Sequence, residues 1–258
     1  MNDFYSMLTP EFLTVILLPA LIGGIAVTLC SSLLGVSLVL KRYSMIGDGL
    51  SHVGFGALSV AAVMNLAPLK VAIPVVILAA VFLLRLSEHS QLKGDSAIAI
   101  FSTSALAIGV LVSSKAGLTN DVSHYMFGSI LAMSREDVLL SVVLSLLVIA
   151  AYMLLYHKIY AITFDEDFAK ATGTNVRFYN LLLAVLTAVT VVLGMMMMGA
   201  LLISSLIIFP SVTAMRVCRS FRSVVICAAL VSVRHYNACA RFGIGGLLPV
   251  RLFPVPDL

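Results

Sequence analysis

The sequence has little charge and no tryptophan. Of its 258 residues, 11% are charged and 61% are hydrophobic, whereas soluble domains carry about 25% charged residues because their surface must be solvated. The 16 Lys and Arg are spread between apolar stretches and form no basic stripe, which excludes a nucleic-acid-binding protein despite a net charge of +4. The scarcity of charge indicates a chain that faces lipid over most of its surface.

Further absences exclude other classes of protein. The chain has 4 cysteines, of which Cys30 lies inside an apolar run, so a disulfide framework is not expected. No Gly-x-x-x-x-Gly-Lys-[Ser/Thr] sequence occurs, so the chain itself does not cradle the phosphates of ATP. No His-Glu-x-x-His sequence occurs, which argues against an intramembrane metalloprotease. We therefore predict a chain that is not an enzyme and holds no permanent cofactor.

Long apolar runs are what the sequence does contain. A helix of about twenty apolar residues crosses a bilayer, and Leu8–Leu40 supplies one such span with a short lead-in. An eighth run begins near Ser223 and stops at Val233. We predict an all-α, polytopic membrane bundle with about 7–8 transmembrane helices, the last of them incomplete. The runs between the first and the eighth are Ser44–Ala67, Val71–Leu86, Ser96–Ser114, Val138–Tyr156, Phe178–Met197 and Gly199–Met215.

The distribution of positive charge orients these spans, because cytoplasmic loops are enriched in Lys and Arg. With the N-terminus outside, the outer loops hold only Lys70, Lys115 and Arg135. We therefore predict an outside N-terminus and a largest inner loop at Tyr156–Arg177. The inner loops then hold Lys41, Arg42, Arg85, Lys93, Lys158, Lys170, Arg177, Arg216, Arg219 and Arg222.

The second run opens with two ionisable residues in the segment Met45-Ile-Gly-Asp-Gly-Leu-Ser-His-Val-Gly-Phe-Gly56. Asp48 and His52 are four residues apart, so a helix places them on one face. His52 lies roughly 14 Å into that helix, near the middle of a hydrocarbon layer of roughly 30 Å, where ionisable groups are costly unless they serve a polar path. A carboxylate and an imidazole suit zinc, manganese or iron. We predict a metal site; the alternative is a structural Asp–His hydrogen bond.

Two ligands do not complete a metal site. A two-fold axis beside this helix would bring two Asp and two His together, a set that suits tetrahedral zinc, while manganese prefers more oxygen ligands. The pair therefore favours a dimeric pore.

The predicted inner loop contains a short helix, Thr163-Phe-Asp-Glu-Asp-Phe-Ala-Lys-Ala-Thr-Gly173. Asp165 is a good N-cap, Glu166 favours the positive end of the helix dipole, and Gly173 can terminate the helix. So short a helix is unstable alone, so we expect a partner outside the membrane to hold it. The alternative is a solvated interfacial helix.

Four blocks of the sequence resemble, in order, the membrane permeases of bacterial ATP-driven importers for zinc, manganese and iron, the ABC-3 type. Gly47-Asp-Gly-Leu-Ser-His52 is similar to that family's second-helix motif, and Tyr125-Met-Phe-Gly-Ser-Ile-Leu131 to its mid-chain block. Phe164–Gly173 is similar to its coupling helix, and Val192–Ala214 to its late helix. As a set they cover about residues 10–230.

The resemblance implies a cobalamin-importer-like fold of the type II ABC importers, located in the bacterial inner or plasma membrane. It implies a homodimer, two cytoplasmic ATP-binding subunits, and an extracytoplasmic metal-binding protein that delivers Zn²⁺ or Mn²⁺, zinc being the first expectation. Asp48 and His52 would be the pore ligands. The contacts with the ATP-binding subunit would involve the coupling helix with Asp165, Glu166, Ala169 and Gly173. A proton-coupled secondary metal carrier is the alternative from another class.

The C-terminus departs from this pattern. Ser223–Val233 gives eleven residues, too few to cross a bilayer, and Arg234, His235 and Asn237 follow. We predict a transmembrane permease domain over residues 1–233. Residues 234–258 are interpreted as an anomalous tail, the product of a frameshift or truncation.

Overall fold

The computed structural model describes residues 18–89, 94–117, 126, 128 and 135–245. Its elements are all helices, and the described residues contain no strand. The all-α prediction is therefore confirmed. In chain order the helices are α3 (Leu18–Leu40), α4 (Ser44–Val63), α5 (Pro68–His89), α6 (Gly94–Lys115), α8 (Arg135–Phe164), α9 (Glu166–Ala171), α10 (Val176–Met198), α11 (Ala200–Val217) and α12 (Phe221–Gly245).

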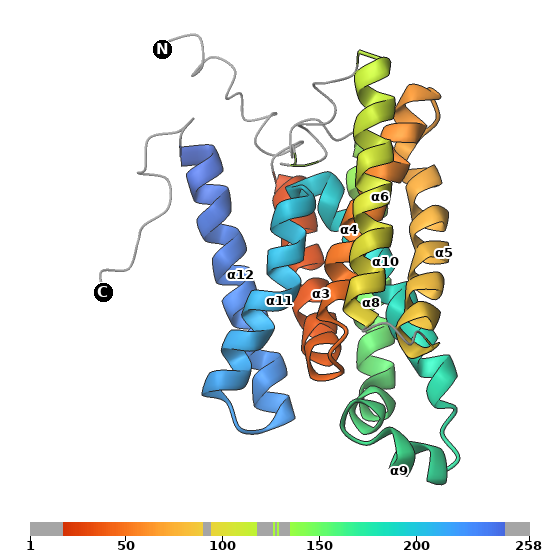
Figure 1. The fold of residues 1–258 in the computed structure, drawn as a ribbon. Coiled ribbons are helices and arrows are strands. Elements are labelled where there is room, and N and C mark those ends of the chain that lie inside the picture. The colour runs from red at the N-terminus through yellow and green to blue at the C-terminus, as the bar shows by residue number, and fades with distance from the viewer. Residues whose placement is uncertain (1–17, 90–93, 118–125, 127, 129–134, 246–258) are drawn as a thin grey trace.

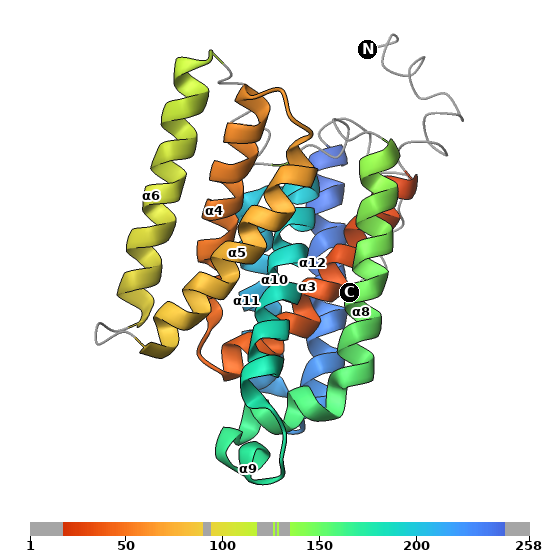
Figure 2. The same ribbon diagram turned by 90° about the vertical axis from the view of Figure 1, so that its right-hand side faces the viewer.

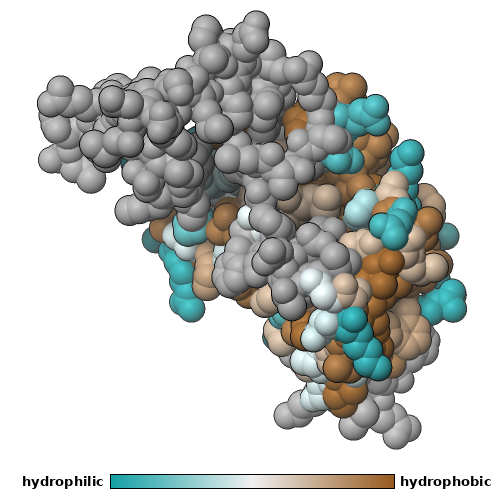
Figure 3. Space-filling view, turned by 90° about the horizontal axis from the view of Figure 1, so that it is seen from above, coloured by the Kyte–Doolittle hydropathy of each residue, from teal (hydrophilic) through white to brown (hydrophobic). Residues whose placement is uncertain are grey.

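Seven of the described helices are long and apolar enough to cross a membrane: α3, α4, α5, α6, α8, α10 and α11. They correspond to the seven complete runs predicted from hydropathy. Large apolar side chains such as Leu78 and Leu154 are exposed on the outside of the bundle, which is where lipid would lie. Figure 3, a view from above, shows apolar residues interspersed with hydrophilic ones on the coloured part of this face.

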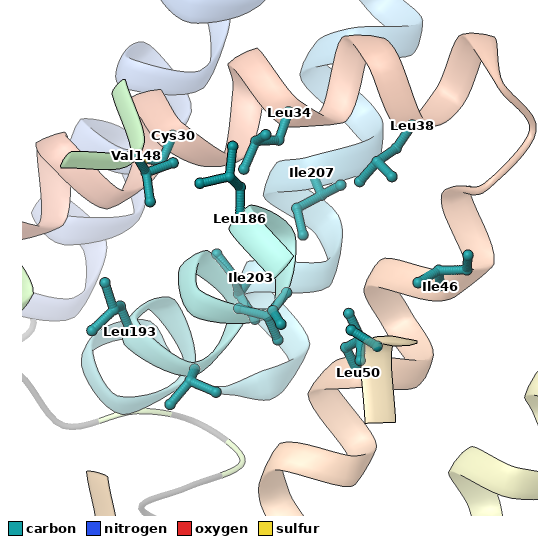
Figure 4. Close-up of a cluster of buried hydrophobic side chains, with 14 of the residues drawn as sticks. Cys30, Leu34, Leu38, Ile46, Leu50, Val148, Leu186, Leu193, Ile203 and Ile207 are labelled. Carbon is teal, nitrogen blue, oxygen red and sulfur yellow. The ribbon is translucent and has the colours of Figure 1, made fainter. Parts of the chain in front are cut away.

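The helices stand side by side around α3 (Figures 1 and 2). Helix α3 packs against α8, α10, α11 and α12, while α4 packs against α5, α6, α10 and α11. One continuous apolar core joins the two groups. Figure 4 shows part of it, with Leu34 and Leu38 from α3, Leu50 from α4, Leu186 from α10 and Ile207 from α11. The core therefore fixes α4 between α6 on one side and α10 and α11 on the other.

Two predicted boundaries are wrong. Helix α8 continues to Phe164, beyond the expected end at Tyr156, so much of the predicted inner loop is helical. Helix α12 does not break at Val233 but continues to Gly245. Its polar residues Arg234 and His235 are exposed, so the helix continues by turning them away from the bundle.

The basic turns lie at one end of the bundle. The α3–α4 turn with Lys41 and Arg42, the α11–α12 turn with Arg219, and α9 with Lys170 all lie at the bottom of Figure 1. Because positive charge favours the cytoplasm, we expect this end to be the inner one.

A cysteine-labelling experiment checks this orientation. In a background without native cysteines, Ala171→Cys on α9 should stay unlabelled by a membrane-impermeant thiol reagent in intact cells and should react after permeabilisation. Ala116→Cys, exposed after α6 at the other end, should react without permeabilisation. Labelling of Ala171→Cys in intact cells would reverse the orientation.

Candidate metal site and coupling helix

Glycines bring α4 unusually close to its neighbours. A Cβ atom at Gly56 would lie 2.7 Å from the Ala105 carbonyl oxygen of α6, and one at Gly54 would lie 2.6 Å from Cε of Met195 on α10. Real Cβ atoms do not approach other atoms so closely, so these positions depend on the missing side chains. The two glycines therefore permit the close approach of α4 to α6 and α10.

Asp48 and His52 lie on the side of α4 next to its contact with α6. At about 100° per residue, His52 lies about 40° around the helix from both Asp48 and Gly56, while Gly54, which faces α10, lies on nearly the opposite side from His52. Asp48 Oδ2 is 3.7 Å from His52 Nε2, with 41% of the Asp48 side chain and 23% of the His52 side chain exposed. That separation is too long for a hydrogen bond. Both side chains therefore share one face and keep lone pairs available for a ligand.

A polar contact holds α4 to α11 beside this pair. The Ser51 hydroxyl donates to the Asp48 carbonyl oxygen at 2.7 Å and lies 3.0 Å from the Ser204 hydroxyl of α11. Because Ser51 uses its one hydrogen on Asp48, the Ser204 hydroxyl is the donor across this contact, and the Ala200 carbonyl oxygen at 3.0 Å is its alternative acceptor. Since each hydroxyl has a partner, the contact fixes the turn of α4 that carries Asp48 relative to the start of α11.

One chain provides only two side chains of this site. Within the described ranges, no three His, Cys, Asp or Glu side chains gather closely enough to hold a metal ion. A tetrahedral zinc site uses four ligands. A zinc site at the pair on α4 would therefore need further ligands from other groups.

Helix α9 forms as the sequence predicts, at the same end of the bundle as the basic turns. Asp165 is its N-cap, with an extended backbone, and its Oδ1 accepts from the backbone N–H of Asp167 at 3.1 Å and of Phe168 at 2.9 Å. The chain then turns at Gly173, whose φ of +77° favours glycine. Local chemistry alone accounts for both ends of this helix.

The two faces of α9 differ sharply. Ala169 is fully buried against Ile162 of α8 and Val176 of α10, so its side chain points into the protein. Phe168, the preceding residue, is 63% exposed and points away. Phe168 was not singled out from the sequence, although an apolar side chain in a short charged helix is a recognisable signal. Ala169 thus holds α9 in place, and Phe168 is the apolar group presented to the outside.

A partly buried ion pair also joins α9 to the end of α3. Lys41 Nζ lies 2.6 Å from Glu166 Oε1, and it also donates to Asn180 Oδ1 of α10. Burial alone would raise the pKa of the Glu166 carboxyl. The hydrogen bond and charge of Lys41, with Asn180 and Lys170, outweigh burial and lower that pKa. The pair is therefore present at neutral pH and is lost as pH falls through the lowered pKa.

Sequence reasoning missed Lys41 and Asn180. In the sequence, Lys41 is one of several basic residues in the predicted inner loops, and Asn180 lies in an apolar run. Lys41 is 125 residues from Glu166 in the chain, and no local pattern indicates a pairing over that distance.

Comparison with known proteins gives one consistent family. A model of the ABC 3 transport family matches residues 14–240. The chain is 29% identical over 219 residues to the high-affinity zinc uptake system membrane protein ZnuB of Haemophilus influenzae, with 84% of each chain covered. It is 28% identical over 207 residues to the manganese import system permease protein ScaB of Streptococcus gordonii, covering 80% of this chain and 74% of that one. Similar relatives therefore include both zinc and manganese proteins.

Solved structures agree with the fold. PsaBC from Streptococcus pneumoniae, solved in complex with Fab, has a chain that is similar with a TM-score of 0.78 and 28% identity, covering 95% of this chain and 87% of that one. An inward-facing metal-chelate type ABC transporter shares the fold at a TM-score of 0.70 and 19% identity, covering 91% of this chain and 79% of that one.

Proposed function

This chain belongs to the ABC 3 transport family, and from that membership we propose that it is the permease of an ATP-driven importer of Zn²⁺. A metal ABC transporter permease is a multi-pass membrane subunit, and the seven apolar helices agree with that role. The observation that carries the proposal is the Asp48–His52 pair, held on one face of an apolar helix with both side chains partly exposed. Ionisable groups are retained at such depth where they serve a transport path.

Zinc is the first choice because of the chemistry of this pair. Two copies of an Asp and a His would supply four ligands of the types zinc accepts. The proposal therefore includes a homodimer whose two α4 helices face each other across the path. Manganese or iron is the second candidate, since several similar relatives are named manganese import or transport proteins and manganese takes carboxylate ligands.

The energy source and the partners follow from α9. A six-residue helix cannot be stable alone, and it presents Phe168 outward at the end that we expect to be cytoplasmic. We propose that a cytoplasmic ATP-binding subunit covers it and that an extracytoplasmic protein delivers the metal. A proton-coupled secondary carrier would have no use for this exposed helix.

Uptake by reconstituted vesicles tests the proposal. With its ATP-binding and metal-delivery partners, the wild-type chain should accumulate ⁶⁵Zn²⁺ only when ATP is supplied on the side of α9. A proton gradient without ATP should give no accumulation. Equal Mn²⁺ uptake would favour the manganese alternative, and uptake driven by the gradient alone would contradict the ATP-driven importer.

We also propose that residues 234–258 are an altered C-terminus. Arg234, His235 and Asn237 are exposed on α12, where lipid would otherwise be expected. Tyr236 is buried against Gly24, yet its hydroxyl has no hydrogen-bond partner among the residues that the structure describes, and such a buried group is destabilising. Resequencing the locus should reveal an apolar alternative frame after about Val233. An unchanged frame that encodes this tail would contradict the proposal.

A further inference from the structure

The Lys41 side chain joins three helices through one partly buried polar cluster. Its ammonium binds Glu166 at 2.6 Å and Asn180, and the Asn180 amide donates to Glu166 Oε1 at 3.3 Å. The Lys41 side chain is 4% exposed, and lysine is almost never so buried unless it is paired. The cluster therefore connects the end of α3, the first residue of α9 and the second turn of α10.

The position of Lys41 in the chain connects this cluster to α4. Lys41 directly precedes the tight turn that leads into α4. In that turn the Arg42 N–H donates to Val39 O at 3.1 Å and the Tyr43 N–H to Leu38 O at 2.8 Å. Arg42 adopts a φ of +60°, which is rare for a residue with a side chain. A turn this constrained passes a displacement of Lys41 to the start of α4, and Asp48 lies about 6 Å further along that helix.

The apolar contacts of α9 connect it to α8 and α10. Ala169 packs on Ile162 of α8 and Val176 of α10, and these contacts hold α9 against the helices that flank it in the chain. The Lys41–Glu166 pair instead leads toward the helix that carries Asp48 and His52.

We propose that Lys41 is a positioning residue that transmits a movement of α9 to the metal-binding face of α4. The proposal rests on the proposed function, in which α9 contacts an ATP-binding subunit and the α4 pair binds the metal. A buried ion pair is weak evidence for stability, because desolvation of both charges offsets their attraction. Its directional bonds to two partners suit a mechanical link, since they specify where α9 sits relative to α3.

Transport coupled to ATP hydrolysis provides the test. Lys41→Gln, in the reconstituted complex with its partners, should lower ⁶⁵Zn²⁺ uptake about tenfold while ATP hydrolysis stays within about twofold of wild type, because couplings between sites typically correspond to factors of roughly 5 to 150. Lys41→Arg should recover most of the uptake, since a guanidinium can bind both partners. Lys158→Gln is the matched control, because Lys158 is an exposed lysine on α8 with only a 3.5 Å contact to Thr174, and its ratio of uptake to hydrolysis should not change.

The outcomes separate the link from a merely structural role. If Lys41→Gln lowers uptake and hydrolysis in proportion, or leaves uptake within about twofold of wild type, the link is disproved. If Lys41→Gln yields no intact complex, Glu166→Gln replaces it, because that partly exposed residue keeps an acceptor oxygen while losing its charge; the same excess loss of uptake over hydrolysis is expected. Failure of the wild-type complex to accumulate zinc would instead contradict the proposed function.

Discussion

Asp48→Asn and His52→Ala should each lower zinc uptake by about a hundredfold or more. Changes in groups that only support a metal ligand already cost roughly 10–100-fold in affinity or activity, and these two side chains are the proposed ligands themselves. The double variant should be no worse than either single one, because the two side chains act as one site. The measurement is ⁶⁵Zn²⁺ uptake in vesicles with matched amounts of complex.

The competing explanation predicts a different result for Asp48→Asn. If the pair served only to stabilise the fold, asparagine would preserve polarity and shape, and uptake would survive. The separation of 3.7 Å already argues against a direct hydrogen bond. Ser59→Ala is a suitable control on the same helix, since the Ser59 hydroxyl is buried without a hydrogen-bond partner in the described part of the chain and its removal should leave uptake unchanged. Near wild-type uptake by Asp48→Asn would eliminate the pore-ligand role.

Phe168→Ala should weaken binding of the ATP-binding subunit by roughly 30-fold or more and lower uptake accordingly. Loss of a central aromatic side chain from a protein interface commonly costs about 2 kcal/mol or more, and Phe168 is the large apolar side chain that α9 presents outward. Co-purification of the ATP-binding subunit and its titration by ATPase activity measure the effect.

Phe178→Ala is the matched control for this substitution. Phe178 lies in α10 and is 55% exposed, compared with 63% for Phe168, so the two variants remove the same side chain at similar exposure. We expect Phe178→Ala to retain the ATP-binding subunit. Equal loss of that subunit in both variants would show that α9 has no special role. Ala169→Arg is unsuitable as an interface probe, because its side chain points at Ile162 and Val176 and would displace α9 itself.

Hydropathy determined the spans because every membrane-crossing helix must satisfy its own backbone hydrogen bonds. A helix that does so needs about twenty apolar residues wherever it lies, so its place in the chain depends on local sequence alone. The same holds for the helix face shared by Asp48 and His52, which follows from the four-residue spacing. It also holds for the cap at Asp165, whose side chain bonds within three residues.

The local sequence pattern did not predict the length of α12, because the apolar run ends at Val233. The helix continues because a helical backbone forms its hydrogen bonds with polar and apolar side chains alike. Packing against the bundle determines that Tyr236 is buried while Arg234 is exposed. Hydropathy ranks residues by solvent preference. It therefore predicts the end of a membrane span at a polar helical turn, even where the backbone hydrogen bonds of the helix continue.

Only the tertiary structure decided which faces of the short segments meet. The sequence placed Ala169 in the coupling helix, but burial against Ile162 and Val176 depends on how α8 and α10 converge. The Lys41–Glu166 pair depends in the same way on the arrangement of α3, α9 and α10. Side chains far apart in the chain meet according to the summed packing of many apolar contacts, each individually weak. The sequence by itself therefore determined the helices and the residues available for chemistry, while the packed bundle decided which of those residues touch.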